Sequence, residues 1–214
     1  MIFRLDERIL FPDPSLAEED GLLAIGGDLS VERLLLAYQN GIFPWYSDDT
    51  PILWYSPHER FVLFPGELKI SKSMKQVLRS ARFSITYNRC FEEVIEACSI
   101  AKREGQDGTW ITDEMKEAYI NLHHEGYAHS VEVWENNVLA GGLYGVEVGN
   151  VFCGESMFSK LSNASKVALI NLCQGGKYQL IDCQVHTEHL ESMGARLISR
   201  KEYMSVLQNA GAKG

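Results

Sequence analysis

Hydrophobic and polar positions alternate between the spacing of helices and that of strands from about residue 61 to residue 198. Apolar runs and strict alternation predict strands, whereas apolar positions three and four residues apart predict helices. We expect strands at 61–64, 83–87, 130–134, 138–145, 151–153, 180–186 and 196–198. We expect helices at 72–82, 91–103, 112–124, 163–172 and 188–193. Helices interleaved with a hairpin-rich sheet indicate an α/β (α+β) fold with a mixed sheet.

The N-terminal residues differ from the rest because Pro and Gly turn signals dominate them. Ser30 is expected to cap a helix that runs through Tyr38 and is closed by Asn40-Gly41. The double glycine Gly26-Gly27 lacks the Lys and Ser/Thr of a phosphate loop, which favours a tight turn. So short a segment cannot hold a stable core alone. We therefore expect a small N-terminal domain over residues 1–61, docked on a larger domain over residues 62–214.

The composition of the 214 residues, with 45% hydrophobic and 23% charged residues, is that of an ordinary globular protein. No apolar run is long enough to span a bilayer and the N-terminus lacks a signal-peptide layout, so we expect a cytoplasmic protein with no membrane contact. The five cysteines form no C-x-x-C pair, and the histidines offer no third ligand. Neither a disulfide framework, a metal site nor a cofactor is expected.

One segment opposes the net charge of −9. No acidic residue lies between Glu67 and Glu92, and one face of a predicted helix carries four cations: Lys72, Lys75, Arg79 and Arg82. The opposite face is apolar, with Met74, Val77, Leu78 and Ala81. Such a stripe suits either a solvated surface or contact with a phosphate backbone, and the sequence leaves both open.

A carboxylate and a carboxamide, Asp182 and Gln184, stand two residues apart within the apolar run 180–186. Alternate residues of a strand point to the same face, so we expect these two side by side and Cys183 on the opposite face. A buried carboxylate is costly unless it is paired or functional. The pair therefore either satisfies nearby backbone at a strand end or carries chemistry.

Turn-rich stretches hold three further candidates. Trp45 and Trp110 lie beside glycine and turn residues, where flat rings stack on nucleobases or pack in a core. Glu155 follows Gly154 just past an apolar strand, a place for a buried acid that holds an ammonium group or caps backbone.

Seven ordered motifs together resemble the leucyl/phenylalanyl-tRNA–protein transferase family over nearly the whole chain. They are Gly21-Leu-Leu-Ala-Ile-Gly-Gly-Asp-Leu-Ser30, Gly41-Ile-Phe-Pro-Trp45, Trp54-Tyr-Ser-Pro57, Thr109-Trp-Ile-Thr112, Phe152-Cys-Gly-Glu-Ser-Met-Phe158, Asn163-Ala-Ser-Lys166 and Leu180-Ile-Asp-Cys-Gln184. The resemblance implies an enzyme that moves Leu or Phe, and less well Met, from aminoacyl-tRNA to the α-amine of proteins beginning with Arg or Lys. Such transfer marks those proteins for N-end rule degradation. It also implies a larger domain with the acetyltransferase-like (GNAT) fold, and we expect a monomer.

The resemblance also assigns roles to residues. Trp45 and Trp110 match the residues that hold the terminal adenosine of the tRNA. Asp182 and Gln184 match the pair proposed to assist attack by the amine, and Glu155 matches a carboxylate of the aminoacyl site. The pocket for the Leu or Phe side chain corresponds to Leu143, Phe152, Leu172 and Ile181, although a larger aromatic residue is expected in place of Leu172. The region that contacts the tRNA backbone corresponds to the helix with Lys72, Lys75, Arg79 and Arg82.

The reaction asks little of the protein, because an aminoacyl ester is already activated and an α-amine with a pKa of about 7.7 to 8.0 is partly neutral at pH 7. Asp182 either takes a proton from the amine or only orients it. Two alternatives differ in class. An acyl-CoA-dependent N-acyltransferase needs a glycine-rich pyrophosphate loop, which residues 158–165 lack. A non-enzymatic RNA-binding module leaves Asp182, Gln184 and Glu155 without a use.

Overall fold

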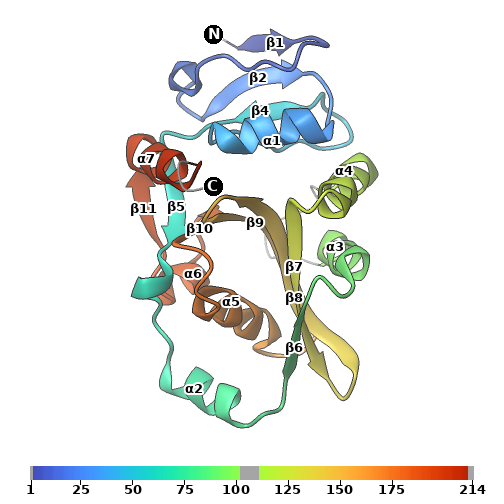
Figure 1. Ribbon diagram of the computed structural model, residues 1–214, viewed down its shortest axis with the longest axis vertical. Coiled ribbons are helices and arrows are strands. Elements are labelled where there is room, and N and C mark those ends of the chain that lie inside the picture. The colour runs from blue at the N-terminus through green and yellow to red at the C-terminus, as the bar shows by residue number, and fades with distance from the viewer. Residues whose placement is uncertain (1, 102–110, 212–214) are drawn as a thin grey trace.

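The computed structural model describes residues 2–101 and 111–211, which form two β-sheets with helices around them (Figure 1). The smaller sheet has the strand order β1 (Phe3–Leu5), β2 (Leu22–Gly26), β4 (Leu53–Tyr55) and β3 (Phe43–Pro44). The larger sheet has the order β11 (Arg196–Ser199), β5 (Glu59–Leu63), β10 (Leu180–Gln184), β9 (Val151–Ser159), β8 (Val138–Val148), β7 (Ala128–Glu135) and β6 (Ser84–Tyr87). The α-helices are α1 (Val31–Gln39), α2 (Lys72–Arg79), α3 (Phe91–Ser99), α4 (Asp113–His124), α5 (Ala164–Gln174), α6 (Glu188–Ser192) and α7 (Arg200–Gly211). Two short 3-10 helices are η1 (Pro14–Leu16) and η2 (Pro65–Glu67).

Both sheets are mixed. Strand β1 runs parallel to β2 in the smaller sheet, and β10 runs parallel to β9 in the larger one, while the other neighbouring strands are antiparallel. The predicted α/β (α+β) class with a mixed sheet is therefore confirmed.

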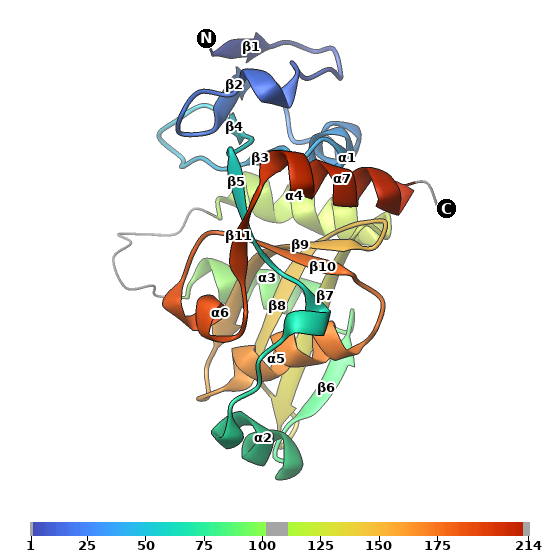
Figure 2. The ribbon, with the colours of Figure 1, turned by 90° about the vertical axis from the view of Figure 1, so that its left-hand side faces the viewer.

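Helices cover both faces of the larger sheet (Figures 1 and 2). On one face, Val94 of α3 and Met115 of α4 share a hydrophobic cluster with Tyr144 of β8. On the other face, Leu169 of α5 packs in a second cluster with Phe152 of β9. Apolar side chains thus leave the central strands on both sides, as expected for a sheet buried between layers.

The smaller sheet and α1 lie at one end of the larger sheet, at the top of Figure 1. Leu23 and Trp54 of the smaller sheet belong to the same cluster as Tyr144 and Val146 of the larger one, so the core is continuous across the two sheets. Helix α1 begins and ends as predicted. The Ser30 side chain accepts a hydrogen bond from the Arg33 N–H, and Asn40 closes the helix.

Local signals predicted some elements well and others poorly. Asn136 and Asn137, both with positive φ, form the turn between β7 and β8 as expected. The basic helix was predicted too long: α2 ends at Arg79, and Ala81 has a φ of 52°, so Arg82 lies outside the helix. Helix α7 and the strands of the smaller sheet were not predicted.

An extra residue in β9 shapes the centre of the molecule. Tyr144 pairs with Ser156 and Gly145 with Gly154, so Glu155 is the additional residue of a β-bulge. A Cβ atom on Gly145 would lie 2.2 Å from the carbonyl oxygen of Cys153, so only glycine allows the strands to approach here. Among the described residues, no helix is long and apolar enough to cross a membrane.

Candidate active site

A cavity of about 900 Å³ is lined by the smaller sheet, by β9 and β10 of the larger sheet and by α5. It brings together eight of the predicted site residues: Trp45, Leu143, Phe152, Glu155, Leu172, Ile181, Asp182 and Gln184. These residues come from segments up to 139 positions apart (184 minus 45). Only the folded chain can therefore bring them together.

Glu155 is a buried carboxylate that accepts three hydrogen bonds. Tyr38 donates at 2.7 Å, Tyr119 at 3.2 Å and the Gln184 side-chain nitrogen at 2.8 Å. Burial raises the pKa of Glu155 to about 7 even though these hydrogen bonds lower it, and the nearby charge of Asp182 adds to the rise. Burial and the charge of Glu155 raise the pKa values of both tyrosines, which therefore remain protonated donors.

Asp182 is fully buried and ion-paired. Its Oδ2 accepts hydrogen bonds from the guanidinium of Arg60 and, at 2.8 Å, from the hydroxyl of Tyr203. Its Oδ1 accepts the backbone N–H of Gln184 at 3.0 Å. Because three donors occupy the carboxylate, the arrangement supports an orienting role for Asp182 more than a role as proton acceptor.

The alternation of strand residues predicted that Asp182 and Gln184 lie side by side. In the structure they do not. The register of β10 shifts between them, and Gln184 has a φ of 57°, in the left-handed region. The Gln184 side chain consequently reaches Glu155, whereas the Asp182 side chain reaches Arg60. The two residues are linked by the Gln184 backbone N–H, which Asp182 holds in this conformation.

Cys183 lies between them and packs in the same cluster as Ile181, on the face of β10 opposite Asp182. It also lines the cavity. Burial, with the charge of Asp182 as a smaller cause, raises the pKa of its thiol. A protonated thiol is a poor nucleophile, which argues against a thiol nucleophile at Cys183.

Trp45 forms an exposed aromatic wall of the cavity. It follows β3 directly, is 43% exposed, and its ring centroid lies 5.9 Å from that of Tyr55. The next residue, Tyr46, donates a 2.9 Å hydrogen bond to Glu114 of α4, which anchors this loop. Trp110 lies outside the residues that the structure describes.

The apolar part of the cavity contains the four residues predicted to form a pocket, all buried: Leu143, Phe152, Leu172 and Ile181. Leu172, the departure from the family pattern, lines the cavity from α5. Leu169, one helical turn before it, and Met157 line the cavity as well and were not predicted.

Four residues of the polar network were also missed: Tyr38, Arg60, Tyr119 and Tyr203. Arg60 carries the clearest signal in the sequence, because it stands at the start of the apolar run Phe61-Val-Leu-Phe64, where a cation needs a partner. The tyrosines fit core positions of their helices and gave no such signal.

The basic stripe lies at the far end of the molecule from the smaller sheet (Figure 1). Lys72, Lys75 and Arg79 are exposed on α2, and within the described ranges none of them is ion-paired with a carboxylate. Arg82 is paired with Glu135. The free part of the stripe is therefore three cations rather than four.

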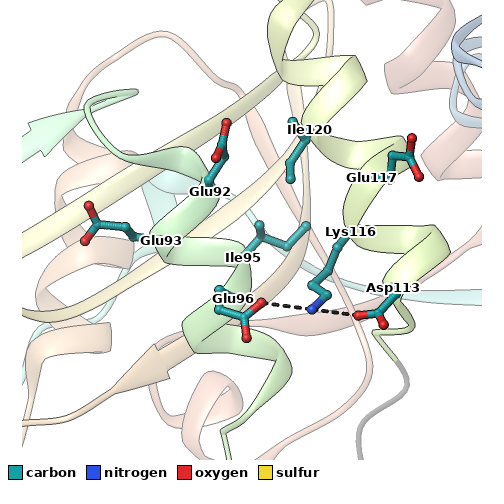
Figure 3. A pocket seen from close by; sticks show the side chains of 8 residues that line it. All are labelled: Glu92, Glu93, Ile95, Glu96, Asp113, Lys116, Glu117 and Ile120. Carbon is teal, nitrogen blue, oxygen red and sulfur yellow. Dashed lines mark hydrogen bonds and ion pairs between the residues drawn. The ribbon is translucent and has the colours of Figure 1, made fainter.

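A second hollow, of about 550 Å³, lies between α3 and α4 (Figure 3). Its lining is acidic, and Lys116 bridges Glu96 at 2.9 Å and Asp113 at 2.8 Å. It contains none of the predicted site residues, and its negative charge opposes an RNA phosphate. Across residues 2–101 and 111–211, no group of three or more His, Cys, Asp or Glu side chains is placed to hold a metal ion.

An apolar pocket, an exposed tryptophan and a buried carboxylate–carboxamide network around one cavity are features of an enzyme that holds an activated group against an attacking one. The family model described as leucyl/phenylalanyl-tRNA protein transferase matches residues 62–208, and the model of its N-terminal domain matches residues 27–58. The chain belongs to this family, and it is a transferase.

Curated relatives agree. A leucyl/phenylalanyl-tRNA–protein transferase of Syntrophobacter fumaroxidans is 58% identical over 209 residues, covering 96% of this chain and 89% of the relative. One of Flavobacterium johnsoniae is 56% identical over 211 residues, covering 97% of this chain and 100% of the relative.

Similarity to solved structures is weaker. A conserved protein of unknown function from Bacteroides thetaiotaomicron has a TM-score of 0.45 at 12% identity, over 71% of this chain and 55% of that chain. A GCN5-related N-acetyltransferase from Kribbella flavida has a TM-score of 0.36 at 9% identity, over 74% of this chain and 57% of that chain.

Proposed function

We propose that this enzyme transfers Leu or Phe, and less well Met, from aminoacyl-tRNA to the α-amine of proteins that begin with Arg or Lys. One observation carries the proposal: a single cavity joins an exposed tryptophan, a set of buried apolar side chains and the hydrogen-bonded network of Glu155, Gln184 and Asp182. These are the parts needed to hold a terminal adenosine, its amino acid side chain and an incoming amine.

On the donor side, Trp45 stacks on the terminal adenine, with Trp110 as its expected partner, and the Leu or Phe side chain enters the pocket of Leu143, Phe152, Leu172 and Ile181. Base stacking on one ring contributes about 1 to 3 kcal/mol. The cations of α2 contact the phosphate backbone of the tRNA, a role that their exposure and free charge support.

Glu155 holds the α-ammonium group of the donor amino acid, since it lines the cavity and keeps 6% of its surface exposed, whereas Asp182 is fully buried. The Gln184 nitrogen donates to Glu155, so the Gln184 carboxamide oxygen is left to accept an N–H of the attacking amine. Asp182 orients Gln184 through its backbone.

The neutral amine attacks the ester carbonyl carbon, and the bond from that carbon to the ribose oxygen breaks. The amine loses one proton and the ribose oxygen gains one, so a peptide bond and uncharged tRNA result. Holding amine and ester in an attacking pose supplies most of what the reaction needs, because the ester is already activated.

The proposal also covers localisation, oligomeric state and domain organisation. It places the enzyme in the cytoplasm as a monomer, where charged tRNA is available, and makes N-end rule degradation the consequence of transfer. It also assigns residues 1–61 and 62–214 to a small N-terminal domain and a larger catalytic domain. The acyl-CoA alternative lacks support because the segment that leads into α5, residues 158–165, contains no glycine.

One experiment tests the reaction. The protein is incubated with Leu-charged tRNA and a peptide beginning with Arg, and in parallel with an N-acetylated copy of that peptide. Transfer to the free peptide alone is expected. Transfer to both peptides, or to neither, contradicts the proposal.

A further inference from the structure

Arg60 is a buried cation beside the cavity, only 2% exposed, and it is not among the described residues that line it. It lies on β5, which pairs with β10 on one side and β11 on the other. Its two terminal nitrogens contact two different parts of the site. One donates to the Gly41 carbonyl oxygen at 2.8 Å, and the other donates to Asp182.

The first contact fixes the loop that presents Trp45. Gly41 and Phe43 lie just ahead of Trp45, and the Arg60 guanidinium carbon sits 4.8 Å from the centre of the Phe43 ring. Phe43 stacks on Tyr55 at 6.4 Å, and Tyr55 in turn contacts Trp45. The position of the tryptophan therefore depends on a path that begins at Arg60.

The second contact fixes Asp182, and through it Gln184. The guanidinium carbon also lies 4.4 Å from the centre of the Tyr203 ring, and the Tyr203 hydroxyl donates to the same Asp182 oxygen. The remaining Asp182 oxygen holds the Gln184 N–H in the left-handed conformation that directs its side chain to Glu155.

We propose that Arg60 is a positioning residue that fixes the donor-binding loop and the Asp182–Gln184 pair relative to each other. This inference rests on the function proposed above. A guanidinium suits the task because it is planar, forms two directed hydrogen bonds at once and stacks on aromatic rings, none of which an ammonium group does equally well. Replacing Arg60 by lysine keeps the positive charge but loses the planar guanidinium, so it distinguishes a positioning role from neutralisation of the Asp182 charge.

The test compares Arg60→Lys with a matched control, Arg33→Lys. Arg33 is equally buried, donates to the Asp6 carbonyl oxygen at 2.8 Å and pairs with Asp28 at 3.2 Å, but it contacts neither Trp45 nor Asp182. Two quantities are measured on folded protein. One is the Kd for adenosine that carries phenylalanine through a 3′-amide, and the other is kcat for transfer from charged tRNA to the Arg peptide.

For Arg60→Lys we expect the Kd to rise and kcat to fall, each by about tenfold, as for a lost hydrogen bond to a charged group. For Arg33→Lys both should stay within about twofold of the unmodified enzyme. A loss in kcat alone for Arg60→Lys overturns the link to Trp45. Equal losses in both variants make Arg60 merely structural. Measurement of the Kd does not depend on the transfer reaction. If the proposed function is wrong, the unmodified enzyme itself shows no transfer, and this result is distinct from a failure of the Arg60 proposal.

Discussion

Replacing Glu155 by glutamine should change how stability depends on pH. Glu155 is 6% exposed and accepts hydrogen bonds from Tyr38, Tyr119 and Gln184. Glutamine has nearly the same shape but does not titrate in the range where the protein is folded. The variant therefore removes one ionisation and leaves every other titrating group in place.

The magnitude follows from the pKa of Glu155, which burial raises from 4.5 to about 7. Between these values the folded chain keeps a proton that the unfolded chain has lost. The free energy of unfolding therefore falls by about 1.4 kcal/mol per pH unit in this window. The contribution is fully present below about pH 4.5 and is lost once the pH has risen through about 7, a total of about 3 kcal/mol.

Urea unfolding at several pH values from 4.5 to 8 measures the effect. All other titrating groups contribute equally to both proteins, so their contributions cancel when the unfolding free energy of the unmodified protein is subtracted from that of Glu155→Gln. This difference should move by about 3 kcal/mol in favour of the variant as the pH rises. A difference that stays constant across the range refutes the reasoning, because Glu155 would then ionise alike in the folded and unfolded chains.

Four further changes have defined outcomes. Asp182→Asn should lower kcat far more than it weakens donor binding, and a loss confined to donor affinity would contradict this. Trp45→Ala should weaken a minimal adenosine donor by about 1 to 3 kcal/mol, whereas an effect on full-length tRNA alone argues against adenine stacking. Replacing the three free cations of α2 by Ala should flatten the log-log salt dependence of tRNA binding by about 0.7 to 0.9 per lost contact, and an unchanged slope returns them to solvated surface. Leu172→Phe should fill spare volume and depress use of Phe-charged tRNA more than Leu-charged tRNA, which relative efficiencies for the two donors measure.

Local chemistry explains which parts of the fold the sequence predicted. Ser30 and Asn40-Gly41 bound α1, and Asn136-Asn137 form a hairpin turn, because each signal acts within a few residues. The predicted end of the basic helix was wrong because Ala81, an ordinary helix former, adopts a left-handed conformation. No residue near Ala81 in the sequence predicts that conformation.

In the candidate site, too, some features were predicted from the sequence and others were not. Eight of the residues predicted for the site lie together at one cavity, but the partners of Asp182 were not predicted from the sequence. Arg60 and Tyr203 reach that carboxylate from 122 and 21 positions away, through strand pairing and a helix that was not predicted. Spacing also placed Asp182 and Gln184 on one face, whereas a bulge turns them toward different partners.

The length of chain between partners in this network governs when the site can form. Arg60 bonds Asp182 across 122 positions, and Tyr38 bonds Glu155 across 117. Contacts so distant along the chain close large loops and form late in folding, after local helices and hairpins. In a partly folded chain, even one rich in secondary structure, the contacts that position Gln184 and Glu155 have therefore not yet formed. Loss of transfer on denaturation should therefore coincide with the main unfolding transition.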